Sequence, residues 1–222
     1  MQDQRAELEW REGQVPVSTR FDDPYFSLED GLAETGHVFL AGNGLPDRFR
    51  DGFHVAELGF GTGLNFLATW AAWRATGLPG SLRFTSFEAF PMAVEDMAAA
   101  LAAFPTLEPL AAQMLAAFEL GIDVVLEVAV LHVVPGDARA ALPAWAGKAD
   151  AWFLDGFSPA KNPELWGADL MGQVAAHTEP QGTVATYTAA GFVRRGLADA
   201  GFTVTRVPGF GRKRHMTTGV LG

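Results

Sequence analysis

The sequence predicts an α/β fold with a seven-stranded, mostly parallel sheet that carries helices on both faces and ends in an antiparallel hairpin. From about Phe53 onward, short β-branched runs alternate with amphipathic runs of helical period. Strands separated by helices favour right-handed crossovers and a parallel sheet covered on both faces. Only residues 208–215 separate the last two expected strands, which is too short for a crossover helix, so these strands should pair antiparallel.

The individual elements follow from the same patterns. Strands are expected near Phe53–Leu58, Leu82–Phe87, Val124–Val134, Ala151–Leu154, Thr183–Thr188, Phe202–Val207 and Met216–Leu221. Helices are expected near Leu64–Thr76, Met92–Ala103, Leu107–Phe118, Pro163–His177 and Phe192–Ala200. Residues 1–50 carry turn signals and are expected to form an irregular cap over the carboxyl edge of the sheet, with the main domain at residues 51–222.

Length and composition limit the possible classes of protein. The 222 residues, 49% of them hydrophobic, suffice for one substantial domain. No run approaches the roughly 18–20 apolar residues of a spanning helix, and the N-terminus lacks the basic start and apolar core of a secretory signal. We therefore expect a cytoplasmic protein without a membrane partner. Cysteine is absent and the five histidines stand at no metal-ligand spacing, so no metal is expected.

The charge is acidic overall but uneven along the chain. A formal net charge of -10 argues against an extended basic surface for nucleic acid. However, Arg194, Arg195, Arg206 and the run 212–214 place 6 of the 16 Lys and Arg residues in the last 29 positions. This part of the chain can present a local basic patch, although a solvated charged face is an equally good interpretation.

A glycine-rich loop follows the first strand of the main domain. Gly59, Gly61 and Gly63 lie in a turn where backbone can approach a ligand closely, and the next helix offers free N–H groups suited to a carboxylate. The spacing GxGxG, preceded by an acid, differs from the GxGxxG of nicotinamide enzymes. A tight structural turn is the alternative interpretation. The cofactor-binding residues predicted from this region are Glu57, Gly59, Gly61, Thr62, Gly63 and Asn65.

Two acids follow the next two strands. Glu88 ends the second strand, where a carboxylate can accept hydrogen bonds from both ribose hydroxyls of a nucleoside cofactor. Asp137 follows the third strand and is placed to accept from an adenine amino group, although aspartate is also a common helix N-cap. With the antiparallel ending, which is the layout of Rossmann-like class I methyltransferases, these acids indicate S-adenosylmethionine as the cofactor. A nicotinamide dehydrogenase is disfavoured.

The fourth strand ends in the most distinctive segment of the chain. Asp155 closes an apolar strand, and a proline-bounded loop with Lys161 and Asn162 follows, at the edge where ligands bind in open α/β sheets. A purely structural loop seldom needs an acid, an amide, a lysine and prolines so close together. We therefore expect Asp155 to contribute to both the cofactor site and the chemistry.

Five segments together resemble one known family. The chain is similar to the methyltransferase domain of the MnmC family of bifunctional tRNA wobble-uridine modification enzymes, and to the standalone counterparts called MnmD. The resemblance runs in order from Phe21 over nearly the whole chain, with alanine common in the family where Ser158 stands. Nothing matches the flavin-dependent oxidase half, so the chain is either a standalone enzyme or a domain of a bifunctional one. The segments are FDDPYFS, GFGTGLNF, WFLDGFSPAKNPELW, AGFVRRGL and GFGRKRHM.

The resemblance implies a reaction and roles for particular residues. The reaction is methyl transfer from S-adenosylmethionine to the exocyclic amine of 5-aminomethyl-(2-thio)uridine at the tRNA wobble position. The product is 5-methylaminomethyl-(2-thio)uridine, and an FAD-dependent oxidase domain or protein would supply the amine. Asp155 and Asn162 are predicted to accept hydrogen bonds from that amine and aim its lone pair. The predicted contacts to the turned-out base and the anticodon phosphates are Tyr25, Phe26, Phe157, Lys161, Arg194, Arg195 and Arg212.

Two other functions remain open from the sequence alone. A small-molecule amine methyltransferase would suit the acidic charge of the chain. A cofactor-binding or RNA-binding module without turnover would make Asp155 and Asn162 incidental. The three aromatic side chains named for base stacking also have an ordinary alternative, since such residues more often belong to a core.

Overall fold

The fold is taken from a computed structural model, which describes residues 5–11, 15–27, 30–118, 121 and 123–222. The strands are β1 (Leu8–Arg11), β2 (Val15–Ser18), β3 (Asp23–Pro24), β4 (His54–Leu58), β5 (Leu82–Glu88), β6 (Asp123–Leu126), β7 (Ala129–Pro135), β8 (Ala149–Leu154), β9 (Thr178–Thr186), β10 (Phe202–Pro208) and β11 (His215–Leu221). The α-helices are α1 (Gly31–Thr35), α2 (Leu64–Thr76), α3 (Val94–Leu101), α4 (Glu108–Phe118), α5 (Ala138–Ala141), α6 (Ala168–Ala176) and α7 (Gly191–Asp199).

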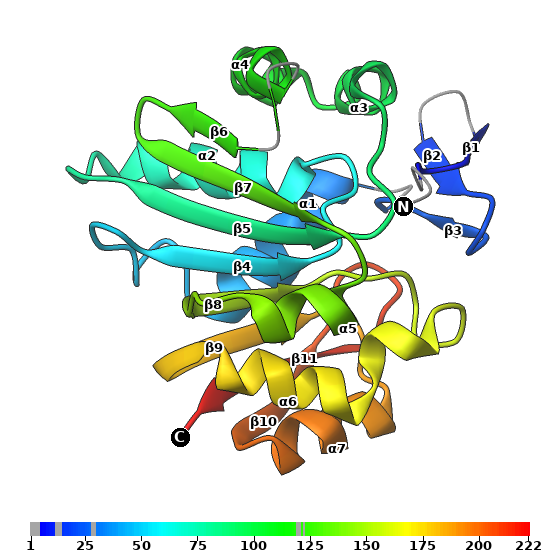
Figure 1. Ribbon diagram of the computed structural model, residues 1–222, viewed down its shortest axis with the longest axis vertical. Coiled ribbons are helices and arrows are strands. Elements are labelled where there is room, and N and C mark those ends of the chain that lie inside the picture. The colour runs from blue at the N-terminus through cyan, green and yellow to red at the C-terminus, as the bar shows by residue number, and fades with distance from the viewer. Residues whose placement is uncertain (1–4, 12–14, 28–29, 119–120, 122) are drawn as a thin grey trace.

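The main sheet is mostly parallel, as predicted. Within the described ranges it has eight strands in the order β10-β11-β9-β8-β4-β5-β7-β6 (Figure 1). Strands β7, β5, β4, β8 and β9 pair in parallel, whereas β11 runs antiparallel to both β9 and β10. The predicted α/β class and its antiparallel ending are therefore confirmed.

Two of the predicted elements are each divided in the structure, β9 begins at Thr178 instead of Thr183, and the short helix α5 was not predicted. The single strand expected over Val124–Val134 is an antiparallel hairpin of β6 and β7, which raises the strand count from seven to eight. Its turn at Glu127 and Val128 contains no glycine, proline or asparagine, so the sequence carried no signal for it. The helix expected over Pro163–His177 is a short 3-10 helix, Pro163–Trp166, followed by α6, because Gly167 has an extended backbone.

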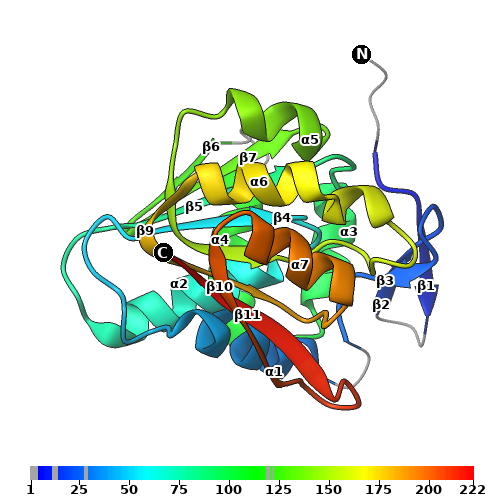
Figure 2. The ribbon, with the colours of Figure 1, turned by 90° about the horizontal axis from the view of Figure 1, so that it is seen from below.

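Helices cover both faces of the sheet (Figure 2). Helices α1 and α2 lie on one face, and α5, α6 and α7 lie on the other. Neighbouring residues of a strand point to opposite faces, so Val55 belongs to the core under α2 whereas Ala56 belongs to the core under α6. In the same way, Phe153 belongs to the core under α2 and Trp152 to the core under α6. The central strands β4 and β8 are thus buried on both sides, which explains their continuous apolar runs.

Helices α3 and α4 extend the core on the side of α2. Met97 and Met114 are buried there with Phe66 of α2. Among the described residues, no single helix is long and apolar enough to span a membrane. Val94–Leu101 and Pro105–Phe118 meet the length and composition criterion only as a pair, with a bend of 118° between them.

The segment predicted as an irregular cap contains regular elements. Strands β1, β2 and β3 form a small antiparallel sheet beyond the carboxyl ends of the parallel strands (Figure 1). Residues 31–43 instead form α1 and short turns of helix, and Phe39 stacks on Phe153 of β8 at 5.3 Å between ring centres. Residues 1–4, 12–14 and 28–29 of this segment lie outside the described residues. The domain boundary at residue 50 stays a prediction.

Candidate active site

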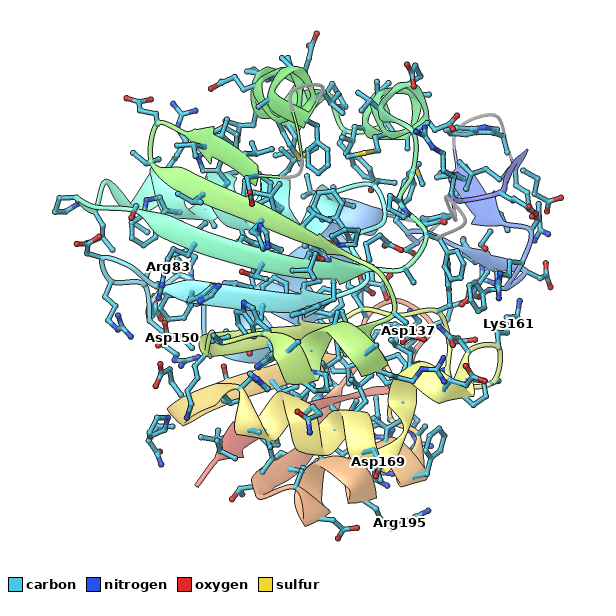
Figure 3. The ribbon with its side chains drawn as sticks, viewed as in Figure 1. Arg83, Asp137, Asp150, Lys161, Asp169 and Arg195 are labelled. Atoms are coloured by element: carbon cyan, nitrogen blue, oxygen red, sulfur yellow. The ribbon has the colours of Figure 1, made fainter. Side chains whose placement is uncertain are left out.

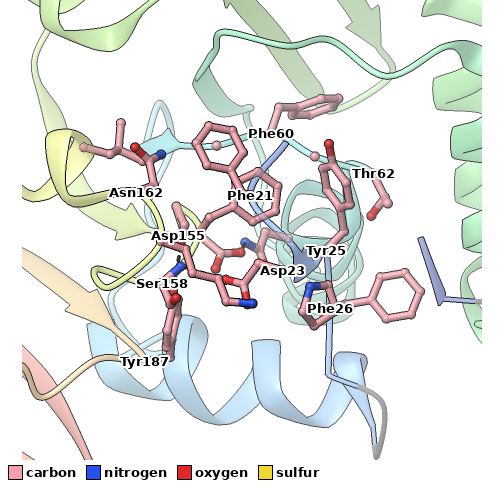
Figure 4. Close-up of a pocket in the computed structure, with 18 of the residues that line it drawn as sticks. Phe21, Asp23, Tyr25, Phe26, Phe60, Thr62, Asp155, Ser158, Asn162 and Tyr187 are labelled. Carbon is pink, nitrogen blue, oxygen red and sulfur yellow. Dashed lines mark hydrogen bonds and ion pairs between the residues drawn. The ribbon is translucent and has the colours of Figure 1, made fainter. Parts of the chain in front are cut away.

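A cavity of about 940 Å³ opens at the carboxyl edge of the sheet. It lies between the loops that follow β4, β5 and β8 and the segment 20–27, which carries β3 (Figure 4). Of the predicted site residues it brings together Tyr25, Phe26, Gly59, Gly61, Thr62, Asn65, Glu88, Asp137, Asp155, Phe157, Lys161, Asn162 and Arg212. Glu57, Gly63, Arg194 and Arg195 do not line it.

The glycine-rich loop brings two strand ends into contact. Gly59 has a φ of +93°, and a Cβ at this position would lie 2.6 Å from the backbone oxygen of Asp155. Gly63 has a φ of +82° and is the N-cap of α2, so its role is to start the helix. The first amides of α2 and the positive end of its dipole suit a carboxylate such as that of a methionine moiety.

The amide of Asn65 connects two carboxylates at the base of the cavity. Its Nδ2 donates to Glu57 Oε1 at 2.8 Å and to Asp155 Oδ2 at 2.7 Å. Asn65 Oδ1 accepts from Thr35 Oγ1 at 2.8 Å, and Glu57 Oε2 accepts from Ser86 Oγ at 2.6 Å. Glu57 is fully buried behind Asn65, so it orients that amide from outside the cavity. Thr35 and Ser86 were not predicted as site residues, because single hydroxyls in a helix and a strand carry no motif.

Both carboxyl groups of this network bind protons more tightly than usual. Burial raises the pKa of Glu57 well above its ordinary value. Burial also raises the pKa of Asp155 to about 7; Asn65 and Lys213 lower it, whereas Glu34 raises it further. A carboxyl group with this pKa can hold or release a proton near neutral pH, as a general acid or base requires.

The residues present fit a nucleoside cofactor. Glu88 Oε2 accepts from the Gly61 amide at 3.0 Å and Oε1 from the Phe90 amide at 2.7 Å, which holds an acceptor carboxylate at the end of β5, where the ribose was expected. Asp137 is the N-cap of α5 and accepts from the Arg139 amide at 2.9 Å, so the helix-cap interpretation is correct and is compatible with its place in the cavity. No three His, Asp or Glu side chains of the described ranges are grouped to hold a metal ion.

The segment 20–27 is fastened to the loop after β8. Phe21 stacks on Phe157 at 4.8 Å, and the Ser158 amide donates to Asp23 Oδ2 at 2.8 Å. Lys161 Nζ donates to the backbone oxygen of Asp22 and, at 3.1 Å, to its Oδ2. Lys161 therefore joins two parts of the cavity wall. Phe21 and Asp23 were missed as site residues although both belong to the quoted FDDPYFS motif.

The three aromatic residues predicted to stack on a base occupy different surroundings. Tyr25 packs edge-on against Phe157, with 5.1 Å between ring centres. Phe26 packs against Phe104 at 5.1 Å, in contact with the core under α2. Tyr25 packs against the same core, and Phe157 is stacked on Phe21. All three side chains line the cavity, and Figure 4 shows Tyr25 and Phe26 there.

The basic face comprises residues of the turn between β10 and β11, which reaches the cavity, and of α7, which does not line it. Arg212 and Lys213 line it from the turn between β10 and β11, whereas Arg194 and Arg195 lie on α7. Figure 3 shows Arg195 on α7, apart from Lys161. Desolvation and the charges of Arg206, Arg214 and Arg194 lower the pKa of His215.

The sheet topology and the cavity together define a Rossmann-like, class I methyltransferase domain. Three features carry this assignment: the reversed last strand, the glycine-rich loop after β4, and acids at the ends of β5 and β8 and just past the end of β7. A sequence model of the S-adenosyl-L-methionine-dependent methyltransferases matches residues 103–222, more than half of the chain. The chain belongs to this family of enzymes, and the predicted cofactor, S-adenosylmethionine, is confirmed.

Curated relatives and solved structures agree with this assignment. The bifunctional protein MnmC of tRNA 5-methylaminomethyl-2-thiouridine biosynthesis is 46% identical in Marinobacter nauticus and 45% identical in Pseudomonas paraeruginosa. Each alignment covers 97% of this chain but only 36% and 35% of the respective relative, so the chain spans about a third of their length. The crystal structure of MNMC2 from Aquifex aeolicus has a TM-score of 0.77 at 26% identity and covers 99% of this chain and 72% of that one. The predicted resemblance to the MnmC methyltransferase domain is confirmed.

A more distant structure shares the fold alone. Spermidine synthase from Thermotoga maritima has a TM-score of 0.58 at 9% identity, over 98% of this chain and 73% of that chain. At this identity the likeness says nothing about the acceptor.

Proposed function

We propose that the chain transfers the methyl group of S-adenosylmethionine to the exocyclic amine of 5-aminomethyl-(2-thio)uridine at the tRNA wobble position. The product is 5-methylaminomethyl-(2-thio)uridine. The observation that carries the proposal is Asp155, whose pKa is about 7 and whose Oδ2 is fixed by Asn65 in the cavity beside the cofactor loop. An amine acceptor needs such a group, because only the neutral amine has a lone pair for the attack.

Asp155 orients the amine for the attack and afterwards accepts its proton. When bound, the cofactor supplies an electrophilic methyl group on a sulfonium centre. Asp155 accepts a hydrogen bond from the amine and directs its lone pair toward that methyl group, with Asn162 of the same cavity as a second acceptor. The proton leaves the amine after the attack, and Asp155 takes it. Gly59 lets the cofactor loop and the Asp155 backbone lie in contact, which keeps donor and acceptor aligned.

The relatives support the acceptor class and its source. Their printed names place them in 5-methylaminomethyl-2-thiouridine biosynthesis on tRNA and describe them as bifunctional. We propose that an FAD-dependent oxidase domain or protein supplies the amine, since the chain spans only about a third of those relatives. A cytoplasmic location follows from the same proposal, because the acceptor is a tRNA.

The anticodon arm is proposed to lie on the basic face. Arg212 lines the cavity, and the positive charges of Arg194 and Arg206 both act on His215 at the start of β11. Arg194, Arg195 and Arg212 are proposed to contact phosphates, with Tyr25 and Phe157 available to stack on the turned-out base. Lys161 is already held by Asp22, so a phosphate contact from it would compete with that bond.

The proposed function is tested by incubating the chain with S-adenosylmethionine labelled in its methyl group and tRNA that lacks the final methyl. We expect the labelled methyl group to appear in the tRNA, in an amount proportional to the 5-aminomethyl-(2-thio)uridine that the tRNA contains. Label in an added small amine but not in tRNA would favour a small-molecule amine methyltransferase, which the net charge of -10 would suit. Binding of cofactor and tRNA without transfer would instead indicate a non-catalytic module.

A further inference from the structure

An ion pair in the wall of the cavity has no part in the proposed transfer step. Lys213 Nζ donates to Glu34 Oε1 at 2.7 Å and lies 4.2 Å from the centre of the Tyr187 ring. Glu34 belongs to α1 and Lys213 to the turn between β10 and β11, and all three side chains line the cavity. Two distant parts of the chain thus place one acid and one ammonium group side by side at the cavity wall.

The pair lies next to Asp155. The charges of Glu34 and Lys213 both act on the Asp155 carboxyl group, with opposite signs. Tyr187 Oη donates to the backbone oxygen of Gly156 at 2.7 Å, so the ring under Lys213 is tied to the residue that follows Asp155. The Glu34 side chain is only 13% exposed, and its carboxylate can accept from a ligand N–H as well as from Lys213.

The pair is complementary to one edge of an aminomethylated uracil. In this base the carbon that carries the aminomethyl group is bonded to C4, whose carbonyl oxygen accepts hydrogen bonds, and N3–H follows as a donor. An amine held at Asp155 therefore brings C4=O and then N3–H toward the groups beside Asp155. An ammonium group donates to a carbonyl, and a carboxylate has a second oxygen that accepts from an N–H.

Resting on the proposed function, we propose that Lys213 and Glu34 read the acceptor base: Lys213 donates to the C4 carbonyl oxygen and Glu34 accepts from N3–H. Cytosine presents the opposite pattern, an amino donor at C4 and an acceptor at N3, so both contacts would be mismatched. A site built to bond a particular N–H rejects analogues that lack it, because its own polar groups are then left unpaired. The pair thus selects uracil among pyrimidines that carry the same amine.

The test compares two anticodon stem-loop RNAs that differ only at N3 of the wobble base. One carries 5-aminomethyluridine and the other its N3-methyl derivative, and binding is measured by fluorescence anisotropy in the presence of S-adenosylhomocysteine. For the unaltered chain we expect about tenfold weaker binding of the N3-methyl RNA. Glu34→Ala should reduce this ratio to near one, and Glu34→Gln, which keeps an acceptor oxygen, should retain part of it. Glu95→Gln on the exposed start of α3 is the matched control and should keep the full ratio.

Several outcomes would overturn the proposal. Equal binding of the two RNAs by the unaltered chain would exclude it before any variant is made. An unchanged ratio in Glu34→Ala would show that the pair only joins α1 to the β10–β11 turn. Failure to bind either RNA would also overturn it. Because binding is measured without turnover, a failure of methyl transfer would reject the proposed function but leave the binding ratio to decide the role of Glu34.

Discussion

The side-chain amide of Asn65 donates to two carboxyl groups at once, to Glu57 Oε1 at 2.8 Å and to Asp155 Oδ2 at 2.7 Å. Glu57 lies inside β4 and Asp155 follows β8, so one amide at the start of α2 links neighbouring strands below the cavity. Ser86 and Thr35 complete the bonds of Glu57 and Asn65. The position of the proposed catalytic carboxylate is thus set by buried groups on several elements.

Removing this amide should change the pH dependence of the reaction. The hydrogen bond from Asn65 lowers the pKa of Asp155, so Asn65→Ala should raise that pKa above about 7. Because the ionised carboxylate is the active form, the acidic limb of kcat/KM should move to higher pH and the loss of rate should shrink at alkaline pH. Gln113→Ala, on the exposed face of α4, is the control and should leave the limb in place. An unmoved limb in Asn65→Ala would contradict this role.

The ionised carboxylate of Asp155 should lower the folding stability of the protein at neutral and alkaline pH. Its pKa rises from 3.8 to about 7 on folding, so the folded state binds the proton more tightly and stability falls as pH rises between these values. Asp155→Asn removes this ionisation, and its gain in Tm over the unaltered protein should be larger at pH 8 than at pH 5. Methyl transfer should be lost while cofactor binding stays measurable. A gain in Tm that is the same at both pH values would show that the carboxyl group is not perturbed.

The cofactor loop should not tolerate a side chain at Gly59. A Cβ there would lie 2.6 Å from the Asp155 backbone oxygen, in a residue with φ of +93°. Gly59→Ala should therefore cost about 1–3 kcal/mol of unfolding free energy and weaken cofactor binding, both measurable by calorimetry. Gly172→Ala in α6 meets no atom within 4 Å and should instead stabilise the helix by about 0.5–1 kcal/mol. Equal effects of the two substitutions would argue against the close approach.

Lys161 should hold the segment 20–27 in place. Its bonds to Asp22 are exposed, so Lys161→Met should change the unfolding free energy by no more than about 1 kcal/mol. Local opening should increase, and hydrogen exchange at residues 21–27 should become faster while exchange in β4 stays the same. Unaltered exchange in the segment would mean that the stacking of Phe21 on Phe157 suffices.

The basic face should contribute to RNA binding through phosphates. Arg194→Ala and Arg195→Ala should each weaken tRNA binding and lower the slope of log K against log salt by about one. Arg83→Ala provides the control, because Arg83 lies at the opposite end of the sheet (Figure 3). If Arg194→Ala and Arg195→Ala show the same salt dependence of tRNA binding as Arg83→Ala and the unaltered chain, the basic face is solvated and makes no contact with RNA.

The parts of the site that follow strand ends could be predicted from the sequence. Gly59 and Asp155 directly follow strands and Glu88 ends one, and a parallel sheet brings such positions to one edge. The hairpin of β10 and β11 was predictable in the same way, because the short connection excludes a crossover.

Other features depend on tertiary packing and had no local signal. Thr35 and Ser86 matter only because Asn65 and Glu57 lie beside them in the fold. Glu34 and Lys213 are far apart in the chain, and no spacing rule joins them. The turn between β6 and β7 uses Glu127 and Val128, residues that equally well continue a strand.

The central claim, methylation of the wobble amine, is tested most directly by the mass of one nucleoside. The chain is incubated with S-adenosylmethionine and tRNA that carries 5-aminomethyl-2-thiouridine, and the digested wobble nucleoside is identified by mass spectrometry. We predict a gain of one methyl group on the exocyclic amine for the unaltered chain and none for Asp155→Asn. An unmodified amine after complete incubation, or a methyl group found on another nucleoside, would contradict the account.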